Sequence, residues 1–270
     1  MVIKMTSTYK DYSIRPLNID KVSDYQRLFG NTFNDFNPTS EYLNWLYGSN
    51  PRGLAVGFDA FHGEDLVAHY ACIPIQIEGC KKKSLLSLNT ATHPQHQGKG
   101  LFKTLAETTF NAQLDDFSNV IGVANSNSTS GFLKHLGFSK LGNLELRFGN
   151  LKRELIGSRV YSTEEIDWRL SCPLRPLKKK ALKNGDFLIS SNSTSKYIRI
   201  KSIISDENRD RDELQSKVFG LTLDWRRGAT PIVKLPEKLK PSPLNLIFKS
   251  LGDPNENVLT SFSFPDFDAL

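Results

Sequence analysis

The chain has 270 residues, 39% of them hydrophobic, and a formal net charge of +6. These values fit one or two packed domains of a soluble globular protein. No apolar run approaches the ~18–20 residues that span a bilayer, and Met1–Lys10 lacks an apolar export segment, so we expect a cytoplasmic protein without membrane insertion. Three scattered cysteines without metal-binding spacing favour free thiols and no metal site.

The positive charge suits an anionic partner, and coenzyme A or a sugar nucleotide would qualify as well as nucleic acid. Two short basic runs, Lys81–Lys83 and Lys178–Lys180, lie far apart and lack interleaved aromatic residues. We therefore interpret them as solvated loop or helix ends and expect no nucleic-acid binding.

The first eighty residues predict strands flanked by two helices. The second helix has Thr39 or Ser40 as its cap and is broken by Gly48-Ser49-Asn50-Pro51. In chain order the expected elements are a strand at Tyr12–Pro16, helices at Ile19–Phe33 and Glu41–Tyr47, and a hairpin of Leu54–Phe61 and Leu66–Ile77.

The segment Gln95-His96-Gln97-Gly98-Lys99-Gly100 connects two contrasting stretches. Ser84–Thr92 before it predicts a buried strand, and Leu101–Phe117 after it predicts an amphipathic helix. Free N–H groups and the positive helix end would make this turn an anion site, best suited to a phosphate or pyrophosphate. A tight turn without a ligand would show the same two glycines, and the spacing matches neither the P-loop nor the dinucleotide fingerprint.

A second strand and a short helix follow. Asn119–Asn125 predicts the strand, Asn127–Ser130 offers helix caps, and Phe132–Phe138 predicts a short helix ended by Gly137. Strand, Gln-x-x-Gly-x-Gly turn, helix, strand, Asn-containing turn and Leu-Gly-Phe, in this order, resemble the GNAT superfamily of acyl-CoA-dependent N-acyltransferases. The resemblance covers Tyr12 to about Gly149 and implies the GNAT fold, an α/β fold with a mixed sheet.

The rest of the chain predicts a smaller second domain. A faint repeat relates Tyr42–Pro51 to Glu165–Pro173, each a short helix with a Trp and a later Pro, and this indicates two related halves. We therefore expect residues 1–154 to form the acyl-CoA-binding GNAT domain and residues 155–270 to form an α/β domain, like a reduced GNAT half, that completes the acceptor cleft. No second Gly-rich turn is present, so only the first half should hold the coenzyme. Further strands are expected at Leu144–Leu151, Phe187–Ser190, Tyr197–Ile204 and around Phe262 and Phe264, the last halted by Pro265.

The resemblance also implies which main-chain groups hold the coenzyme. In the family the pantetheine arm lies as an extra strand along the strand before the phosphate turn, which here means Ala91, Thr92 and His93. Asn125 is a further candidate contact, or a turn-forming Asn, and the flanking His93 and His96 could equally be exposed loop residues. The implied pyrophosphate contacts are Gln97, Gly98, Lys99, Gly100 and Leu101, with Lys99 as a point charge.

Two departures from the family concern acid–base chemistry. The position of the family's tyrosine acid is Leu133, beside Phe132, and Ser84–Thr92 contains no carboxylate base. The candidate catalytic residues are His69, whose ordinary pKa of ~6.5 suits proton transfer, and Asn89, the most polar large side chain of the central strand. A satisfied core histidine is the alternative for His69. A sugar amine of low basicity would need little help, since general acid–base catalysis is typically worth ~10²–10⁴-fold.

Trp45 and Tyr47 are predicted to line the acceptor pocket, although aromatic residues at helical spacing are also typical of a core. The stretch Tyr42–Pro51 and the terminal Asp-Phe-Asp resemble two-domain GNAT enzymes of bacterial surface-polysaccharide pathways. This implies direct transfer of acetyl or 3-hydroxybutyryl from acyl-CoA to a nucleotide-linked amino sugar, such as a dTDP-3-amino-3,6-dideoxyhexose, for O-antigen or capsule synthesis by a monomer or homodimer. The alternatives are a protein, peptide or aminoglycoside amine as acceptor, or a non-catalytic acyl-CoA-binding module.

Overall fold

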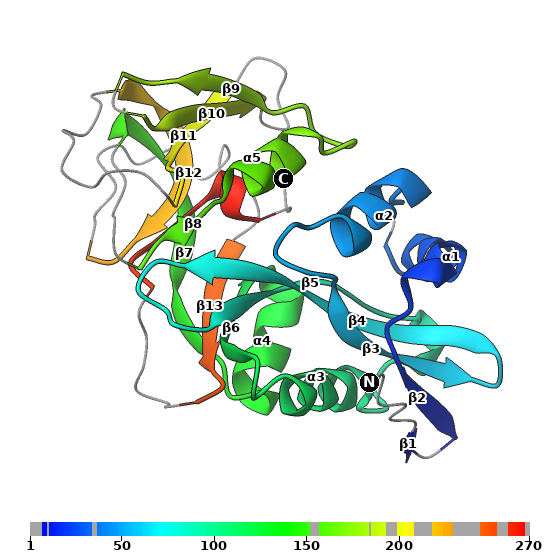
Figure 1. Ribbon diagram of the computed structural model, residues 1–270. Helices are drawn as coiled ribbons and strands as arrows, with labels where there is room; N and C mark the ends of the chain where they lie inside the picture. Colours follow the sequence, from blue (N-terminus) through cyan, green and yellow to red (C-terminus); the bar gives the residue numbers. More distant parts are fainter. Residues whose placement is uncertain are drawn as a thin grey trace.

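The computed structural model describes residues 7–9, 11–33, 37–151, 157–183, 185–192, 199–207, 218–228, 244–252 and 259–267. Within these ranges, fourteen strands join one mixed sheet with helices on both faces (Figure 1). The α/β class expected from the sequence is confirmed. The remainder of Met1–Lys10, the start of the strand expected at Tyr197–Ile204, and Asp268–Leu270 lie outside the described residues.

The elements of the first half follow the expected order. The strands are β1 (Ser7–Tyr9), β2 (Tyr12–Pro16), β3 (Val56–His62), β4 (Asp65–Ile77), β5 (Lys83–Thr92), β6 (Phe117–Ala124) and β7 (Ser139–Leu151). The helices are α1 (Val22–Thr32), which follows a 3₁₀ turn at Ile19–Lys21, α2 (Ser40–Gly48), α3 (Leu101–Ala112) and α4 (Ser126–His135).

The second half is richer in strands. Its one described helix is α5 (Thr163–Leu170). Its strands are β8 (Arg159–Val160), β9 (Lys178–Ala181), β10 (Phe187–Asn192), β11 (Arg199–Ile204), β12 (Val218–Arg226), β13 (Leu244–Ser250) and β14 (Ser261–Ser263), the last followed by a 3₁₀ turn at Phe264–Asp266.

Two helix bounds differ from the sequence prediction. Helix α3 stops at Ala112 rather than Phe117, because Phe117 is buried as the first residue of β6. Helix α4 begins at Ser126, before the predicted start at Phe132, because the Asn125 side chain accepts hydrogen bonds from the amides of Asn127 and Ser128 at 3.1 and 3.0 Å. The polar residues that had been assigned to a turn therefore form the first turn of the helix.

Apart from β1 and β2 at one edge, the sheet has the same order of strands on either side of its middle. On one side it runs β3-β4-β5-β6-β13, and on the other β9-β10-β11-β12-β7, with β13 and β7 paired in the middle. The pairing senses match as well, since β5 and β6 are parallel, β11 and β12 are parallel, and the other pairs on this path are antiparallel. The two halves are therefore related by a pseudo-twofold axis that passes between β13 and β7.

Each half gives one strand to the other. Strand β13 comes from the C-terminal half but pairs with β6, whereas β7 comes from the first half and pairs with β12. Four residues of β13, Leu246 to Lys249, face Val120 to Val123 across this pairing. The division at residue 154 stays a prediction, and the exchanged strands cross it.

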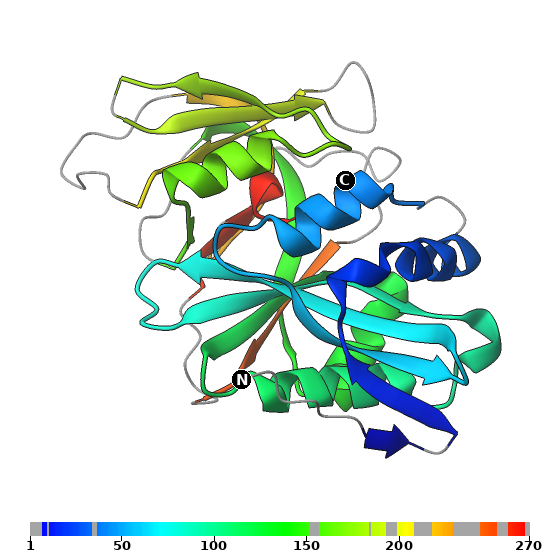
Figure 2. The same cartoon turned by 45° about the vertical axis from the view of Figure 1, so that its right-hand side comes forward.

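The repeat expected from the sequence has a structural counterpart in α2 and α5. The indole N–H of Trp45 donates to the carbonyl oxygen of Trp168 at 2.8 Å, and the indole N–H of Trp168 donates to the carbonyl oxygen of Trp45 at 3.0 Å. The two rings stack with centroids 4.6 Å apart and planes 17° apart. This reciprocal pair joins the halves, and Figure 2 shows the two helices side by side.

The sheet buries apolar side chains on both faces. Helices α1, α2 and α5 cover one face, where Tyr25, Phe29 and Ile73 are buried, and α3 and α4 cover the other, where Leu105 and Phe132 are buried (Figures 1 and 2). Among the described helices none is both long and apolar enough to cross a bilayer.

Two expectations for the second half were wrong. Lys178–Lys180 is not a loop or helix end but part of β9, an edge strand whose four residues are all exposed. Phe264 lies in the 3₁₀ turn rather than in a strand. In both places the strand pairing depends on residues far away in the chain, and local periodicity therefore did not show it.

Candidate functional site

The two parallel strands at the centre of the first half separate at one end. Strands β5 and β6 are paired from Lys83 and Phe117 as far as Ser87 and Gly122. Beyond this point β5 continues to Thr92 against β4 alone, while β6 ends against β13. One backbone edge of β5 therefore has no strand partner among the described residues. An extended ligand could add to such an edge as an extra strand.

A bulge in β5 lies at the point of separation. His69 pairs with Ala91 and Ala71 pairs with Leu88, so two residues of β5 face one residue of β4. Asn89 lies in this bulge with φ of 48°, and no other described non-glycine residue has a positive φ. Bulges re-aim side chains, and Asn tolerates the left-handed conformation better than most residues do. The bulge turns the predicted catalytic Asn89 towards Tyr47, to which its amide Nδ2 donates at 3.1 Å.

The Gly-rich turn follows β5 and leads directly into α3. Gly98 and Gly100 have φ of 72° and 81°, which only glycine adopts without strain, and Gly100 is the residue before the helix without a side-chain cap. The first backbone bond of the helix runs from Thr104 N to Gly100 O. In the described part of the chain nothing accepts a hydrogen bond from the amides of Leu101, Phe102 and Lys103, and these amides are suited to an anion.

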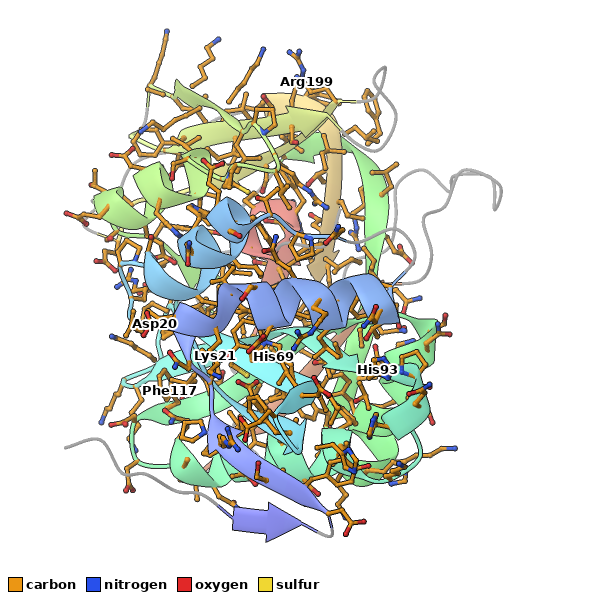
Figure 3. All side chains as sticks on the ribbon, turned by 90° about the vertical axis from the view of Figure 1, so that its right-hand side faces the viewer. Asp20, Lys21, His69, His93, Phe117 and Arg199 are labelled. Atoms are coloured by element: carbon orange, nitrogen blue, oxygen red, sulfur yellow. The ribbon has the colours of Figure 1, made fainter. Side chains whose placement is uncertain are left out.

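A chain of polar side chains leads from the bulge into the core. Tyr47 and His69 are joined by a hydrogen bond of 2.9 Å at Nε2, and His69 Nδ1 lies 2.7 Å from Asp59 Oδ1. The second oxygen of Asp59 accepts from the Tyr25 hydroxyl at 2.7 Å. His69 and Tyr47 are 1% and 0% exposed, respectively, and Figure 3 shows His69 beneath α1.

The partners fix the direction of each hydrogen bond. A carboxylate can only accept, so His69 Nδ1 is the donor to Asp59, and in the tautomer with its single proton there Nε2 accepts from the Tyr47 hydroxyl. The Tyr47 oxygen then accepts from Asn89. Burial raises the pKa of Tyr47 above its usual value, and the hydrogen bond from Asn89 offsets part of the shift. Tyr47 therefore stays protonated and fixes the side-chain amide of Asn89 by accepting from its Nδ2. The Oδ1 of Asn89 remains available as an acceptor.

The other residues predicted for the site form hydrogen bonds or ring contacts within the protein. The Lys99 ammonium donates to the Tyr12 hydroxyl at 3.0 Å, and Gln97 Nε2 donates to the carbonyl oxygen of Thr92 at 3.2 Å. Asn125 uses its side-chain oxygen as the α4 cap, and its coenzyme contact stays a prediction. Trp45 is 7% exposed in the stacked pair, so an acceptor would meet it only indirectly.

The surroundings of Leu133, the position expected from the resemblance for the family tyrosine, are apolar. Phe132 is buried against Phe102 and Phe138 with ring centroids 5.0 and 5.1 Å away, and Leu133 is half-buried. Asp59 and Tyr25 belong to the polar chain but were not singled out from the sequence. A carboxylate within the otherwise apolar Val56–Phe61 was the signal that could have identified Asp59.

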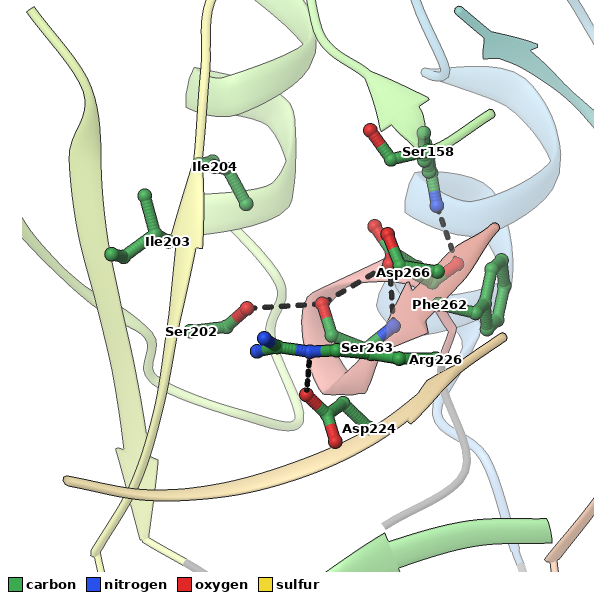
Figure 4. A pocket seen from close by; sticks show the side chains of 11 residues that line it. Ser158, Ser202, Ile203, Ile204, Asp224, Arg226, Phe262, Ser263 and Asp266 are labelled. Atoms are coloured by element: carbon green, nitrogen blue, oxygen red, sulfur yellow. Dashed lines mark hydrogen bonds and ion pairs between the residues drawn. The ribbon is translucent and has the colours of Figure 1, made fainter. Parts of the chain in front are cut away.

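The corresponding separation in the second half is filled by the chain itself. Strands β11 and β12 pair only at Ile200 and Leu221, and β14 then pairs with β12 from Asp224 to Arg226. The hydroxyls of Ser202 and Ser263 lie 3.0 Å apart and join β11 to β14 (Figure 4). The pocket left there has a volume of about 30 Å³, which holds water rather than a coenzyme arm.

Comparison with known proteins identifies the first half. Residues 13–139 match the family model described as an acetyltransferase (GNAT) domain. This range contains the separation of β5 and β6, the Gly-rich turn and the polar chain. The sequence has no match among curated proteins.

Solved structures of low sequence identity are similar to parts or most of this chain. A Pyrococcus horikoshii protein, described as a candidate acetyltransferase, has a TM-score of 0.53 and 9% identity over 95% of this chain and 95% of its own. An Enterococcus faecalis protein, described as a probable N-acyltransferase of unknown function, has a TM-score of 0.47 and 12% identity over 68% of this chain. This chain spans about half, 52%, of that protein. An Escherichia coli GNAT family N-acetyltransferase, solved with CoA, has a TM-score of 0.39 and 13% identity over 50% of this chain and 72% of its own.

The family match concerns the first half. Residues 13–139, a little under half of the chain, are similar to the acetyltransferase (GNAT) domain. The Pyrococcus horikoshii structure extends the likeness of fold to nearly the whole chain, including the strand-rich second half.

Proposed function

We propose that the chain is an acyl-CoA-dependent N-acyltransferase that acylates the amine of a nucleotide-linked amino sugar by direct attack in a ternary complex. The observation that carries this proposal is the open edge of β5, which lies beside the uncapped start of α3. An extended arm ending in a thioester and a pyrophosphate fits these two features together. Free backbone groups along the edge suit the arm, and free amides at the turn suit the phosphates.

The coenzyme contacts in this proposal are those expected from the sequence. The main chain of Ala91, Thr92 and His93 would hold the pantetheine arm, and the amides from Gln97 to Leu101 would hold the pyrophosphate. Asn125 would contact the arm from the end of β6. The acyl group, acetyl or 3-hydroxybutyryl, would then lie at the bulge, where Leu88, Asn89 and Thr90 are half-buried.

Asn89 would orient the attacking amine. Its Nδ2 is engaged by Tyr47, so its Oδ1 can accept an N–H of the acceptor. An amide does not take up a proton, and His69 is enclosed by Asp59 and Tyr47. In this proposal His69 therefore acts through the Tyr47 hydroxyl, and the proton of a weakly basic sugar amine leaves mainly to water.

The charge around the opening favours an anionic acceptor over a polycationic antibiotic. None of the strand residues at the separation of β5 and β6 is acidic, and Asp59 is 2% exposed and committed to His69 and Tyr25. The net charge of +6 acts in the same direction. The bordering residues are Leu88–His93, Val123–Asn125 and Leu244–Asn245.

The test combines thermal shift with thiol release. Coenzyme A, acetyl-CoA and 3-hydroxybutyryl-CoA are screened with and without dTDP-linked amino sugars, and thiol release is measured for each pair. A ligand at ~100 times its Kd adds ~2.7 kcal/mol of stability, which gives a readily measured shift in Tm. We expect acyl-CoA to stabilise the protein and the amino sugar to trigger release.

Three other outcomes would change the proposal. Coenzyme binding without release for any amine would indicate a binding module. Release with a peptide or aminoglycoside alone would replace the acceptor class. No shift with any coenzyme would remove the transferase proposal altogether.

A further inference from the structure

Three of the five histidines of the chain gather beside the Gly-rich turn. His62 ends β3, and His93 and His96 lie between β5 and α3. The ring centroids of His62 and His96 are 5.3 Å apart, and those of His93 and His96 are 5.7 Å apart. The Tyr12 ring lies 5.6 Å from His62 and 5.7 Å from His96. We call His62, His93, His96 and Lys99 the histidine cluster.

Hydrogen bonds orient two of these rings. The Lys99 ammonium donates to the Tyr12 oxygen at 3.0 Å, and that oxygen lies 2.9 Å from His96 Nδ1. The amide of Gln95 donates to His93 Nδ1 at 3.4 Å. In the tautomer of each ring whose Nδ1 accepts, the Tyr12 hydroxyl donates to His96 and the ring proton lies on Nε2. Each presents an N–H donor from a half-buried position beside the turn.

The charges around His96 keep it neutral while no anion is present. Burial lowers its pKa, and Lys99, His62 and His93 lower it further. Asp65, at the start of β4, acts in the opposite direction, but its carboxylate is also 3.8 Å from the guanidinium of Arg27. A bound anion would reverse this balance, because it attracts the positive charge that the neighbours repel.

We propose that the histidine cluster binds the ribose 3′-phosphate of coenzyme A and takes up a proton as that phosphate binds. The proposal rests on the proposed function, since the turn beside the cluster would hold the pyrophosphate of the same molecule. The ligand chemistry is a phosphate monoester, which carries nearly two negative charges at neutral pH. Imidazole N–H groups and an ammonium group supply charge-assisted hydrogen bonds to it.

The proton step can be written at named atoms. A proton from solvent binds Nδ1 of His96, and the ring then carries a positive charge with N–H groups on both nitrogens. The Tyr12 hydroxyl, which had donated to Nδ1, then accepts a hydrogen bond from it, and its oxygen can accept from Lys99 as well. The other nitrogen of His96 faces the phosphate as a charged donor.

A metal is the main alternative ligand for three histidines. Among the described residues, however, no group of three or more His, Cys, Asp or Glu side chains is arranged to hold a metal ion. The bond from Tyr12 also occupies Nδ1 of His96, and Lys99 adds a positive charge that would repel a cation. The cluster is built for an anion.

The experiment compares two coenzymes that differ only in this phosphate. Coenzyme A and dephospho-coenzyme A are titrated into the full chain by calorimetry at about pH 6.5 and about pH 8, between which histidine titrates while the phosphate stays largely dianionic. Each titration is run in two buffers of different ionisation enthalpy, which gives the number of protons taken up. We expect coenzyme A to bind at least about tenfold more tightly than dephospho-coenzyme A at the lower pH, with proton uptake, because only coenzyme A has the phosphate that forms charge-assisted hydrogen bonds with the cluster.

Variants separate the cluster from general charge effects. His96→Asn and His62→Asn should each reduce the preference for coenzyme A and remove its pH dependence, while dephospho-coenzyme A binds as before. His135→Asn is the matched control, because His135 is exposed at the end of α4, outside the cluster.

Failure here and failure of the proposed function give different results. Equal binding of the two coenzymes, or a preference that survives both variants and ignores pH, would overturn the histidine cluster as the phosphate site. If neither coenzyme binds, the coenzyme site itself is lost and with it both proposals.

Discussion

The two halves of the molecule have the same arrangement of strands but differ at one point. In both, two parallel strands separate, and in the first half the separation is left open beside a Gly-rich turn and a helix. In the second half β14 pairs into it, and Phe262 on that strand is 1% exposed. One architecture therefore yields either an open edge or a closed core, depending on what the chain places between the strands.

The connections after the parallel strands explain this difference. Residues 93–116 follow β5 and include the turn and α3, whereas only residues 205–217 lie between β11 and β12. No helix begins in the described part of this second connection, residues 205–207, whereas α3 begins directly after the Gly-rich turn. A buried ion pair reinforces the closed state, since Arg159 donates to Glu165 at 2.7 Å and to the carbonyl oxygen of Asp266.

The largest expected effect tests the closed half. Phe262→Ala should lower the free energy of unfolding by about 3–5 kcal/mol, because it empties a buried ring position that stacks on Phe267. Urea unfolding measures it. Phe148→Ala is the control, since that ring is 52% exposed and should change stability by about 0.5 kcal/mol or less. Similar effects for the two would show that β14 does not belong to the core.

The next comparison uses two glycines of the same conformation, one in each half. Gly98 and Gly185 have φ of 72° and 77° with open space around them, so a valine at either should cost about 1–2 kcal/mol of stability. Only Gly98→Val should also weaken coenzyme binding, by at least about tenfold, because its backbone faces the phosphates. Calorimetry with coenzyme A measures this, and unchanged affinity in Gly98→Val would remove the pyrophosphate assignment.

A third test addresses the axis that relates the halves. Trp45→Phe and Trp168→Phe each remove one of two reciprocal hydrogen bonds and should each cost about 1–3 kcal/mol. The double variant should show a coupling of about 0.5–1.5 kcal/mol, as expected for stacked rings. Chemical denaturation of all four proteins completes the cycle. Strictly additive effects would mean that the stacked pair does not join the halves energetically.

The smallest effect concerns the polar chain behind Asn89. Tyr47→Phe should lower kcat about tenfold, the equivalent of one hydrogen bond, without changing the Kd of the coenzyme. Tyr70→Phe is the control, because its hydroxyl is equally buried but donates to Ser87, in the core covered by α3 and α4. It should change stability and leave kcat unchanged. An unaltered kcat in Tyr47→Phe would mean that these hydrogen-bonded polar side chains stabilise the core and have no role in catalysis.

Local sequence patterns were sufficient to predict most of the helices and strands of the first half. Tyr12–Pro16 was predicted with its observed bounds, and the Thr39 cap of α2 accepts from Tyr42 at 3.2 Å as the cap rule requires. Alternation and helical spacing identify such elements because the residues that decide them are neighbours in the sequence. The Gly-rich turn belongs to this group, since the apolar patterns on either side place it between a strand and a helix.

Strand partners and buried polar contacts could not be obtained in this way. Strand β13 pairs with β6 across more than a hundred residues, and Asp59 meets His69 only because β3 and β4 pair side by side. The sequence by itself determined the GNAT-like order of elements, the Gly-rich turn between a strand and a helix, and the existence of a second, related half. Only the tertiary structure decided the exchanged strands, the closed second half and the hydrogen bonds that link Asn89 to Asp59. These features depend on contacts between segments that are far apart in the sequence, and local patterns do not show which distant segments pair.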